Sequence, residues 1–244
     1  MLQLTNEERL IKIPNLKNCR DLGGYETQSG YYTKAHKYLR SSNVATLTSK
    51  DLDALLDYGV DVVVDLRGSF EQSKQPNQLI DFEQISYYHV DMLDLGRLED
   101  VDDSIKNYDE LTGYYRFVVE AAKGQIKKVF EIFLKHQDDT ILFHCSQGKD
   151  RTGIIAALLM DLVGCFEYDI VKNYSETATH IAQMMPYLEA LVEDGNKQYL
   201  SSHPNNMIFL LGYLYENYGS ARGYLMDIGL SEDQIDQLVE SFVI

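Results

Sequence analysis

The sequence contains no tryptophan, only three cysteines and only four prolines in 244 residues, and its basic side chains are outnumbered. Three scattered cysteines exclude the class of small domains that a disulfide framework holds together. Lysine and arginine together number 22 against 38 aspartates and glutamates, so the formal net charge is −16. Because nucleic acid and anionic membrane surfaces repel such a chain, we expect neither as its main partner.

Long apolar runs are also missing from the sequence. No stretch reaches the roughly 20 apolar residues of a membrane-spanning helix, so we expect no stable membrane insertion. The first residues lack a basic region followed by an apolar run, so no signal peptide is visible and the cytoplasm is the expected compartment. With 45% hydrophobic side chains the chain can bury one complete core, and we expect residues 1–244 to form a single domain.

Segments with strand and helix patterns alternate over the first two thirds of the chain. Thr48 opens a helix with a capping box, and apolar periodicity predicts another helix over 115–133. From about residue 166 the pattern is helical. We therefore expect an α/β fold, with a central, mainly parallel sheet flanked by helices and an extended helical C-terminal region. The expected strands are 36–40, 60–66, 85–90 and 140–143.

The acidic stretch from 84 to about 113 has two interpretations. It is rich in carboxylates and polar enough to be a lid loop, or short helices, that covers a functional site. The alternative is an ordinary acidic connection on the surface.

One segment carries a definite chemical pattern. Between the strand 140–143 and the apolar helix 154–160 runs His-Cys-Ser-Gln-Gly-Lys-Asp-Arg-Thr-Gly, residues 144–153. A loop that curls into the start of a helix turns backbone N–H groups inward and binds phosphate there. Arg151 adds a planar fork that meets two phosphate oxygens, and the positive surroundings favour the thiolate of Cys145, which can attack the bound phosphorus.

Most residues of this segment have a candidate role. His144 can fix the loop from behind, and the Thr152 hydroxyl can donate to the sulfur of Cys145. A buried structural cysteine beside a surface arginine is the alternative, but seven matched positions arise by chance on the order of once in a billion starts. The candidate phosphate-binding residues are Ser146, Gln147, Gly148, Lys149, Asp150 and Arg151.

The segment resembles the signature loop of the cysteine-based protein tyrosine phosphatases. Its HCxxGKDRTG form resembles a bacterial branch, the atypical tyrosine phosphatases that share features with phosphoinositide phosphatases. Residues 18–25 (NCRDLGGY) resemble the N-terminal NxRDLGGY motif of that branch, although Cys19 stands where the family usually carries an aromatic residue. Residues 39–42 (LRSS) and 218–225 are similar to two further elements, so the resemblance spans nearly the whole chain.

The resemblance implies a phosphomonoester hydrolase that acts on phosphotyrosine in proteins or peptides through a phosphocysteine intermediate on Cys145. It also implies that Arg20 and Asp21 support the catalytic loop. We expect no cofactor, and no metal because His180 and His203 each stand alone.

Other functions remain alternatives. A phosphoinositide or dual-specificity phosphatase of the same mechanism is one, since Lys149 can neutralise additional phosphates. A rhodanese-like sulfurtransferase fits the His-Cys start and Arg-Thr-Gly finish less well. A non-catalytic phosphate-binding module would have no need of the nucleophile.

Three carboxylates are candidates for the proton donor to the leaving phenol. A phenol has a pKa near 10, so its departure at neutral pH needs a general acid. The classical tyrosine phosphatases carry that acid in a Trp-Pro-Asp loop, and this chain has no tryptophan. Asp94, on the loop after the strand 85–90, is our preferred candidate, with Asp91 and Asp150 as alternatives; Asp65 reads as a structural partner of Arg67.

We interpret the two other cysteines, Cys19 and Cys165, mainly as buried packing residues. Cys165 follows an apolar helix and is expected to be buried. A reversible disulfide between Cys19 and Cys145 is a less favoured hypothesis, since buried thiols are mostly inert.

Overall fold

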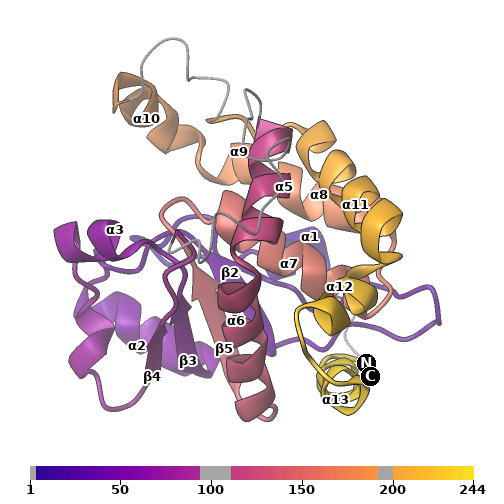
Figure 1. The fold of residues 1–244 in the computed structure, drawn as a ribbon. Coiled ribbons are helices and arrows are strands. Elements are labelled where there is room, and N and C mark those ends of the chain that lie inside the picture. The colour runs from indigo at the N-terminus through magenta and orange to yellow at the C-terminus, as the bar shows by residue number, and fades with distance from the viewer. Residues whose placement is uncertain (1–3, 94–110, 192–199) are drawn as a thin grey trace.

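The computed structural model of the chain describes residues 4–93, 111–191 and 200–244. Its centre is a five-stranded sheet in the order β1-β2-β5-β3-β4 (Figure 1). Strands β2, β5, β3 and β4 are parallel, and β1 pairs with β2 in the antiparallel direction. The α/β class with a mainly parallel sheet is therefore confirmed. The strands are β1 (Arg20–Asp21), β2 (Tyr38–Ser41), β3 (Val60–Asp65), β4 (Ser86–His89) and β5 (Thr140–His144).

Helices connect these strands and, as predicted, fill the C-terminal region. The apolar periodicity over 115–133 predicts one helix, but the structure has two, because Ala122 leaves the helical conformation with ψ 23°. The first part of the chain contributes α1 (Asn6–Arg9), α2 (Ser49–Tyr58), α3 (Ser69–Lys74), the 3₁₀ turn η1 (Gln78–Asp81), α5 (Leu111–Ala121), α6 (Lys123–Lys135) and α7 (Asp150–Leu162). The C-terminal part contributes α8 (Glu167–Ser175), α9 (Thr177–His180), η3 (Ala182–Met184), α10 (Met185–Leu191), α11 (Pro204–Tyr218), α12 (Ala221–Asp227) and α13 (Glu232–Phe242).

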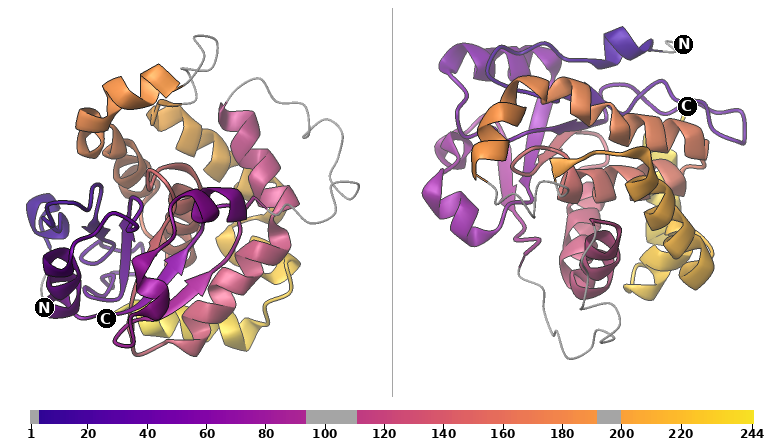
Figure 2. Two further views of the ribbon diagram at one scale, coloured as in Figure 1. Left: turned by 90° about the vertical axis from the view of Figure 1, so that its left-hand side faces the viewer. Right: turned by 90° about the horizontal axis from the view of Figure 1, so that it is seen from above.

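The sheet separates two hydrophobic clusters. Alternate strand residues point to opposite faces, so Val62 and Val64 join the cluster under α5, α6 and α7, while Val63 joins the cluster under α2. Helix α7 is apolar all round and almost wholly buried, because α11 to α13 pack on α5, α6, α7 and α8 on the same side of the sheet (Figure 2). Within the described ranges, no helix is both long and apolar enough to cross a bilayer.

The carboxyl ends of the parallel strands meet at one edge of the sheet. His144 at the end of β5 is in register with Ser41 of β2 and with Asp65 of β3. Loops that leave this edge are where α/β proteins build their sites. The loop that begins at Cys145 is one of them.

The C-terminal residues are paired with the segment that follows the NCRDLGGY motif. Ile244 and Tyr32 exchange two backbone hydrogen bonds of 3.0 Å, and Lys34 N–H donates to the carbonyl of Phe242 at 2.7 Å. The first thirty-odd residues are thus tied both to the sheet and to the far end of the chain.

The packing of α6 on the sheet yields a stability prediction. Phe133 is fully buried, with ring centroids 5.0 Å from Tyr38 and 5.8 Å from Phe143. Phe133→Ala is expected to lower the free energy of unfolding by about 3–5 kcal/mol in urea titrations, since it removes buried area and leaves a cavity. Phe70→Ala, at a side chain that is 74% exposed, is the control and should cost less than about 0.5 kcal/mol. Equal costs for the two variants would contradict the packing described.

Candidate active site

The loop from Cys145 to Lys149 joins the end of β5 to the start of α7. The 13-residue α7 directs the positive end of its dipole at the loop, which favours an anion there. Cys145 is 2% exposed and Arg151, in the first turn of α7, is 9% exposed. The structure therefore brings the predicted thiol and guanidinium together at one helix N-terminus.

Gly148 is the tightest point of this loop. Its φ is +68°, and a Cβ atom there would lie 2.3 Å from the carbonyl oxygen of Ser41, so a side chain does not fit. Its own carbonyl oxygen accepts from Arg40 Nη2 at 2.7 Å and from Asn18 Nδ2 at 3.0 Å. Asn18 also donates to the carbonyl of Gln147 at 3.1 Å. Because a peptide group is planar and trans, the N–H groups of Gly148 and Lys149 point away from Asn18 and Arg40, as a phosphate site requires.

Glu71 of α3 holds Arg151. Its carboxylate accepts from Arg151 Nη1, from Arg151 Nη2 at 3.0 Å and from the hydroxyl of Ser146. It also accepts from Gly68 N–H at 2.8 Å, as the capping residue of α3. Arg151 Nη1 further lies 3.4 Å from the carbonyl of Leu66, so within the described residues the Nε–H and one Nη2–H are left for a phosphate.

Sequence reasoning missed Glu71. The available signal was an acid three residues after Gly68, at the start of a helix that leaves the carboxyl edge of the sheet. Asn18 and Arg40 lie inside motifs that the sequence did single out, but their contacts with the loop were not predicted.

Arg20 and Asp21 have different surroundings. Arg20 is buried, and its Nη2 donates to Asn18 Oδ1 at 2.9 Å and to Thr177 Oγ1 at 3.1 Å, so it reaches the loop through Asn18. The hydrogen bonds of Asp21 go elsewhere: its carboxylate accepts from Gly23 N–H, His36 N–H and Tyr58 Oη, each at 2.7 Å. Asp21 therefore fastens the N-terminal motif to α2 rather than to the loop.

His144 lies behind the loop, fully buried. Its Nδ1 is 3.1 Å from the carbonyl oxygen of Cys145, which makes Nδ1 the protonated nitrogen, and its Nε2 is 3.7 Å from Asp65. Burial lowers the pKa of His144, so the ring is neutral at neutral pH. The Thr152 hydroxyl is buried and makes no hydrogen bond with any described residue, including Cys145. Arg67 holds Asp65 with bonds of 2.7–3.0 Å, as expected.

The structure describes two of the three candidate general acids. Asp94 lies outside the described residues. Asp91 accepts hydrogen bonds from the N–H groups of Ser69 at 2.6 Å and Leu93 at 2.9 Å. Asp150 is inside the loop segment, and its Oδ1 accepts from Tyr115 Oη at 2.7 Å and lies 3.3 Å from Lys149 Nζ.

Tyr115 is anchored in turn by Tyr174. The two hydroxyls are 2.8 Å apart, and since Tyr115 donates to Asp150, Tyr174 is the donor of this pair. Burial, followed by the charge of Asp150, raises the pKa of Tyr115, which keeps its hydroxyl protonated. Lys149 is 1% exposed and donates to the carbonyl of Ser201 at 3.1 Å, so its charge is directed into the protein.

All three cysteines are free and buried. Cys145 and Cys165 belong to the cluster under α7, whereas Cys19 belongs to the cluster on the other face of the sheet. Burial raises the pKa of the Cys19 thiol, and it raises that of Cys165 to about 12. This placement argues against the disulfide hypothesis. Among the described residues, no group of three or more His, Cys, Asp or Glu side chains is arranged to hold a metal ion.

Comparison with known proteins decides the family. The model of the tyrosine phosphatase family matches residues 11–244. The chain belongs to this family. The match confirms what the loop and the N-terminal motif predicted.

Named relatives agree with this assignment. A tyrosine-protein phosphatase of Nostoc commune is 32% identical over 216 residues, 84% of this chain and 73% of the relative. A candidate tyrosine-protein phosphatase of Cupriavidus necator is 30% identical, over 71% of this chain and 64% of the length of that relative. The triple specificity protein phosphatase PtpB of Mycobacterium tuberculosis is 29% identical, over 40% of this chain and 42% of the length of PtpB.

The contact between Glu71 and Arg151 predicts a pH-dependent stability. Burial raises the pKa of Glu71, but the hydrogen bonds and charge of Arg151, with the hydrogen bonds from Ser146 and Gly68, together lower it from 4.5 to about 2. A depressed pKa stabilises the fold above the unfolded value and loses that contribution as pH falls to the folded value. Urea titrations should therefore show Glu71→Gln less stable than wild type above pH 4.5, with the gap closing toward pH 2.

The exposed Glu83→Gln serves as the matched control for this prediction and should show no such gap. Turnover of Glu71→Gln at neutral pH should also fall, by about 10²-fold, because Arg151 loses its orientation. A constant gap across the pH range would contradict the role given to Glu71.

Proposed function

We propose that this chain hydrolyses phosphotyrosine in proteins or peptides, with Cys145 as the nucleophile and Arg151 as the phosphate-binding fork. One observation carries the proposal. The thiol of Cys145 begins a loop whose carbonyls are fixed outward by Asn18 and Arg40, while α7 and Arg151 supply positive charge. Family membership supports the same reaction.

The reaction follows from this geometry in two steps. The Cys145 thiolate attacks phosphorus, and a P–S bond forms while the P–O bond to the phenol breaks. A general acid gives its proton to the departing phenol oxygen. Water then gives a proton to the deprotonated acid and attacks phosphorus, a P–O bond forms while the P–S bond breaks, and phosphate and the thiolate are released. Arg151 and the N–H groups of Gly148 and Lys149 stabilise the equatorial oxygens in both steps.

Broader specificity is the main alternative. The relative PtpB is named a triple specificity phosphatase, which favours testing phosphoserine and phosphothreonine. A phosphoinositide phosphatase has less support, because Lys149, which was expected to meet additional phosphates, is buried against Ser201. A rhodanese-like sulfurtransferase and a non-catalytic binding module are disfavoured by family membership together with the intact Cys145 and Arg151.

Substitution of the nucleophile tests the proposal. Cys145→Ser is expected to lose turnover of para-nitrophenyl phosphate and of phosphotyrosine peptides by at least about 10³-fold, without added metal, while its thermal unfolding stays unchanged. Cys165→Ala is the matched control and should retain the wild-type rate. Residual activity above a few per cent in Cys145→Ser would mean that another group is the nucleophile. Parallel assays with phosphoserine, phosphothreonine and soluble phosphoinositides rank the alternative substrates.

Leaving-group dependence identifies the general acid. We expect Asp94→Asn to slow phosphotyrosine hydrolysis by roughly 10²–10⁴-fold and para-nitrophenyl phosphate hydrolysis less, since nitrophenolate leaves without a proton. The alkaline limb of its pH–rate profile should flatten. Asp91→Asn and Asp150→Asn are the comparison variants. If Asp150→Asn shows this dependence and Asp94→Asn behaves like wild type, the proton comes from inside the loop.

A further inference from the structure

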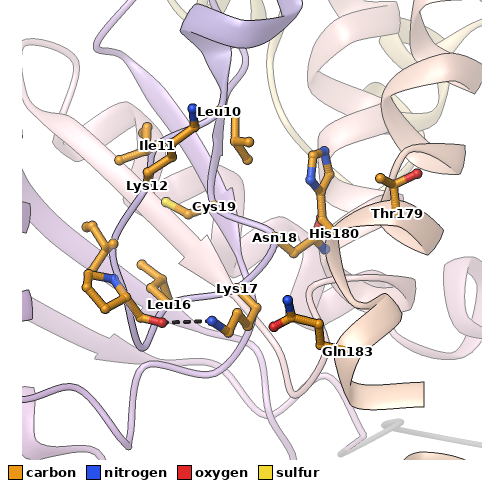
Figure 3. Close-up of a pocket in the computed structure, with 12 residues that line it drawn as sticks. Leu10, Ile11, Lys12, Leu16, Lys17, Asn18, Cys19, Thr179, His180 and Gln183 are labelled. Carbon is orange, nitrogen blue, oxygen red and sulfur yellow. Dashed lines mark hydrogen bonds between the residues drawn. The ribbon is translucent and has the colours of Figure 1, made fainter. Parts of the chain in front are cut away.

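Two hollows lie next to the phosphate-binding loop, along the N-terminal segment 10–19. The first, called here the inner hollow, has a volume of about 490 Å³ and reaches Ser146 and Gln147 of the loop. The second, called the outer hollow, has a volume of about 460 Å³ and is lined by Asn18, His180 and Gln183 (Figure 3). Both are lined by Pro14 and Lys17, so the two hollows adjoin, and the pair of them is called here the path.

The charge along this path is opposite to that of the whole chain. Among the described residues that line the two hollows none is acidic, and Lys12 and Lys17 are cationic, in a chain of net charge −16. Burial, and then the charges of Arg20 and Arg40, lower the pKa of His180 to about 4, so His180 adds no positive charge to the outer hollow at neutral pH. Lys12 meets Glu7 at 3.7 Å, but both side chains are largely exposed, so that pair is weak.

The position of Lys17 relative to the loop is fixed by backbone hydrogen bonds. Ser42 N–H donates to the carbonyl of Lys17 at 3.0 Å, and Lys17 N–H donates to Ser42 Oγ at 3.2 Å. The next residue, Asn43, donates its N–H to the carbonyl of Ser146 at 3.1 Å. The ammonium group donates to Pro14 O at 2.7 Å, as Figure 3 shows, and so is held where the two hollows meet.

The inner hollow also has an apolar wall. Met184, Tyr187 and Leu188 line it from η3 and α10, and Tyr187 is 66% exposed. Side-chain amides of Asn43, Gln75 and Gln147 line the same hollow and can bond peptide groups. An extended chain with alternating backbone amides and side chains uses all of these features, whereas a compact inositol headgroup would leave the apolar wall unused.

We propose that the two hollows bind the peptide chain of an acidic phosphotyrosine substrate, with Lys17 contacting a carboxylate a few residues from the phosphotyrosine and Tyr187 packing on an apolar side chain. This inference rests on the proposed function and names its substrate class. Lys17 and Tyr187 then determine specificity without acting on the phosphorus.

Paired peptides test the inference. One phosphotyrosine peptide carries aspartates and glutamates on both sides, and the other carries asparagines and glutamines at those positions. Wild type is expected to prefer the acidic peptide by about five- to tenfold in kcat/KM, through KM, with the preference weakening as salt is added. Lys17→Gln should erase the preference, and Tyr187→Ala should raise KM for both peptides. Neither should change the rate with para-nitrophenyl phosphate.

Lys128→Gln, which removes the same charge from the exposed side of α6, is the control and should keep the preference. A second measurement is independent of turnover. Fluorescence anisotropy gives the affinity of each labelled peptide for Cys145→Ser and for the double variant that also carries Lys17→Gln. Absence of turnover by wild type, with Lys17-dependent binding of the acidic peptide to Cys145→Ser, would overturn the proposed function and support the two hollows as a peptide-binding site. Equal affinity for the two peptides would overturn the proposal that the two hollows bind an acidic peptide. Lys17-dependent binding of soluble phosphoinositides that is tighter than peptide binding would overturn it too.

Discussion

The carbonyl oxygen of Gly148 is the point on which the site depends. It receives hydrogen bonds from Asn18 and Arg40, two residues more than 100 positions earlier in the sequence. Arg40 is bound in turn to Asn173 of α8 at 2.6 Å, and Arg20 links Asn18 to α8 and α9. The conformation of a five-residue loop is thereby set by the sheet, the N-terminal motif and the C-terminal helices together. This explains why the family resemblance extends over nearly the whole chain although the chemistry occupies one loop.

A phosphate site in a chain of net charge −16 has to create its own field. Three buried guanidinium groups, those of Arg20, Arg40 and Arg151, surround the loop. Burial, and then the proximity of Arg20, lowers the pKa of Arg40 to about 9, because its charge loses water and lies near a second positive group. Glu71 offsets part of that charge at Arg151. The net negative charge makes the rest of the surface unfavourable to anions, while the loop and the two hollows beside it are free of that effect.

The sequence predicted the four parallel strands but not β1. Strands β3 and β5 were evident because buried parallel strands are apolar runs, and the loop was evident because its chemistry is local. What it missed depends on distant packing. Lys149 turns toward Ser201, and Asp21 toward Tyr58, because of contacts that no spacing in the sequence reveals. Glu71 reaches Arg151 only because α3 and α7 start at the same edge of the sheet. The division of the helix predicted over 115–133 into α5 and α6 depends on the backbone of a single alanine, which the apolar periodicity does not signal.

The pairing of Tyr32 and Lys34 with Ile244 and Phe242 has a consequence for synthesis of the chain. The segment from Asn18 to Lys34 leaves the ribosome before residues 242–244, with which Tyr32 and Lys34 form backbone hydrogen bonds in the finished fold. The loop at 145–151 also emerges about ninety residues before these partners. Cys145 therefore emerges before the N-terminal segment can complete its pairing, and the loop reaches its finished surroundings only after residues 242–244 have been synthesised.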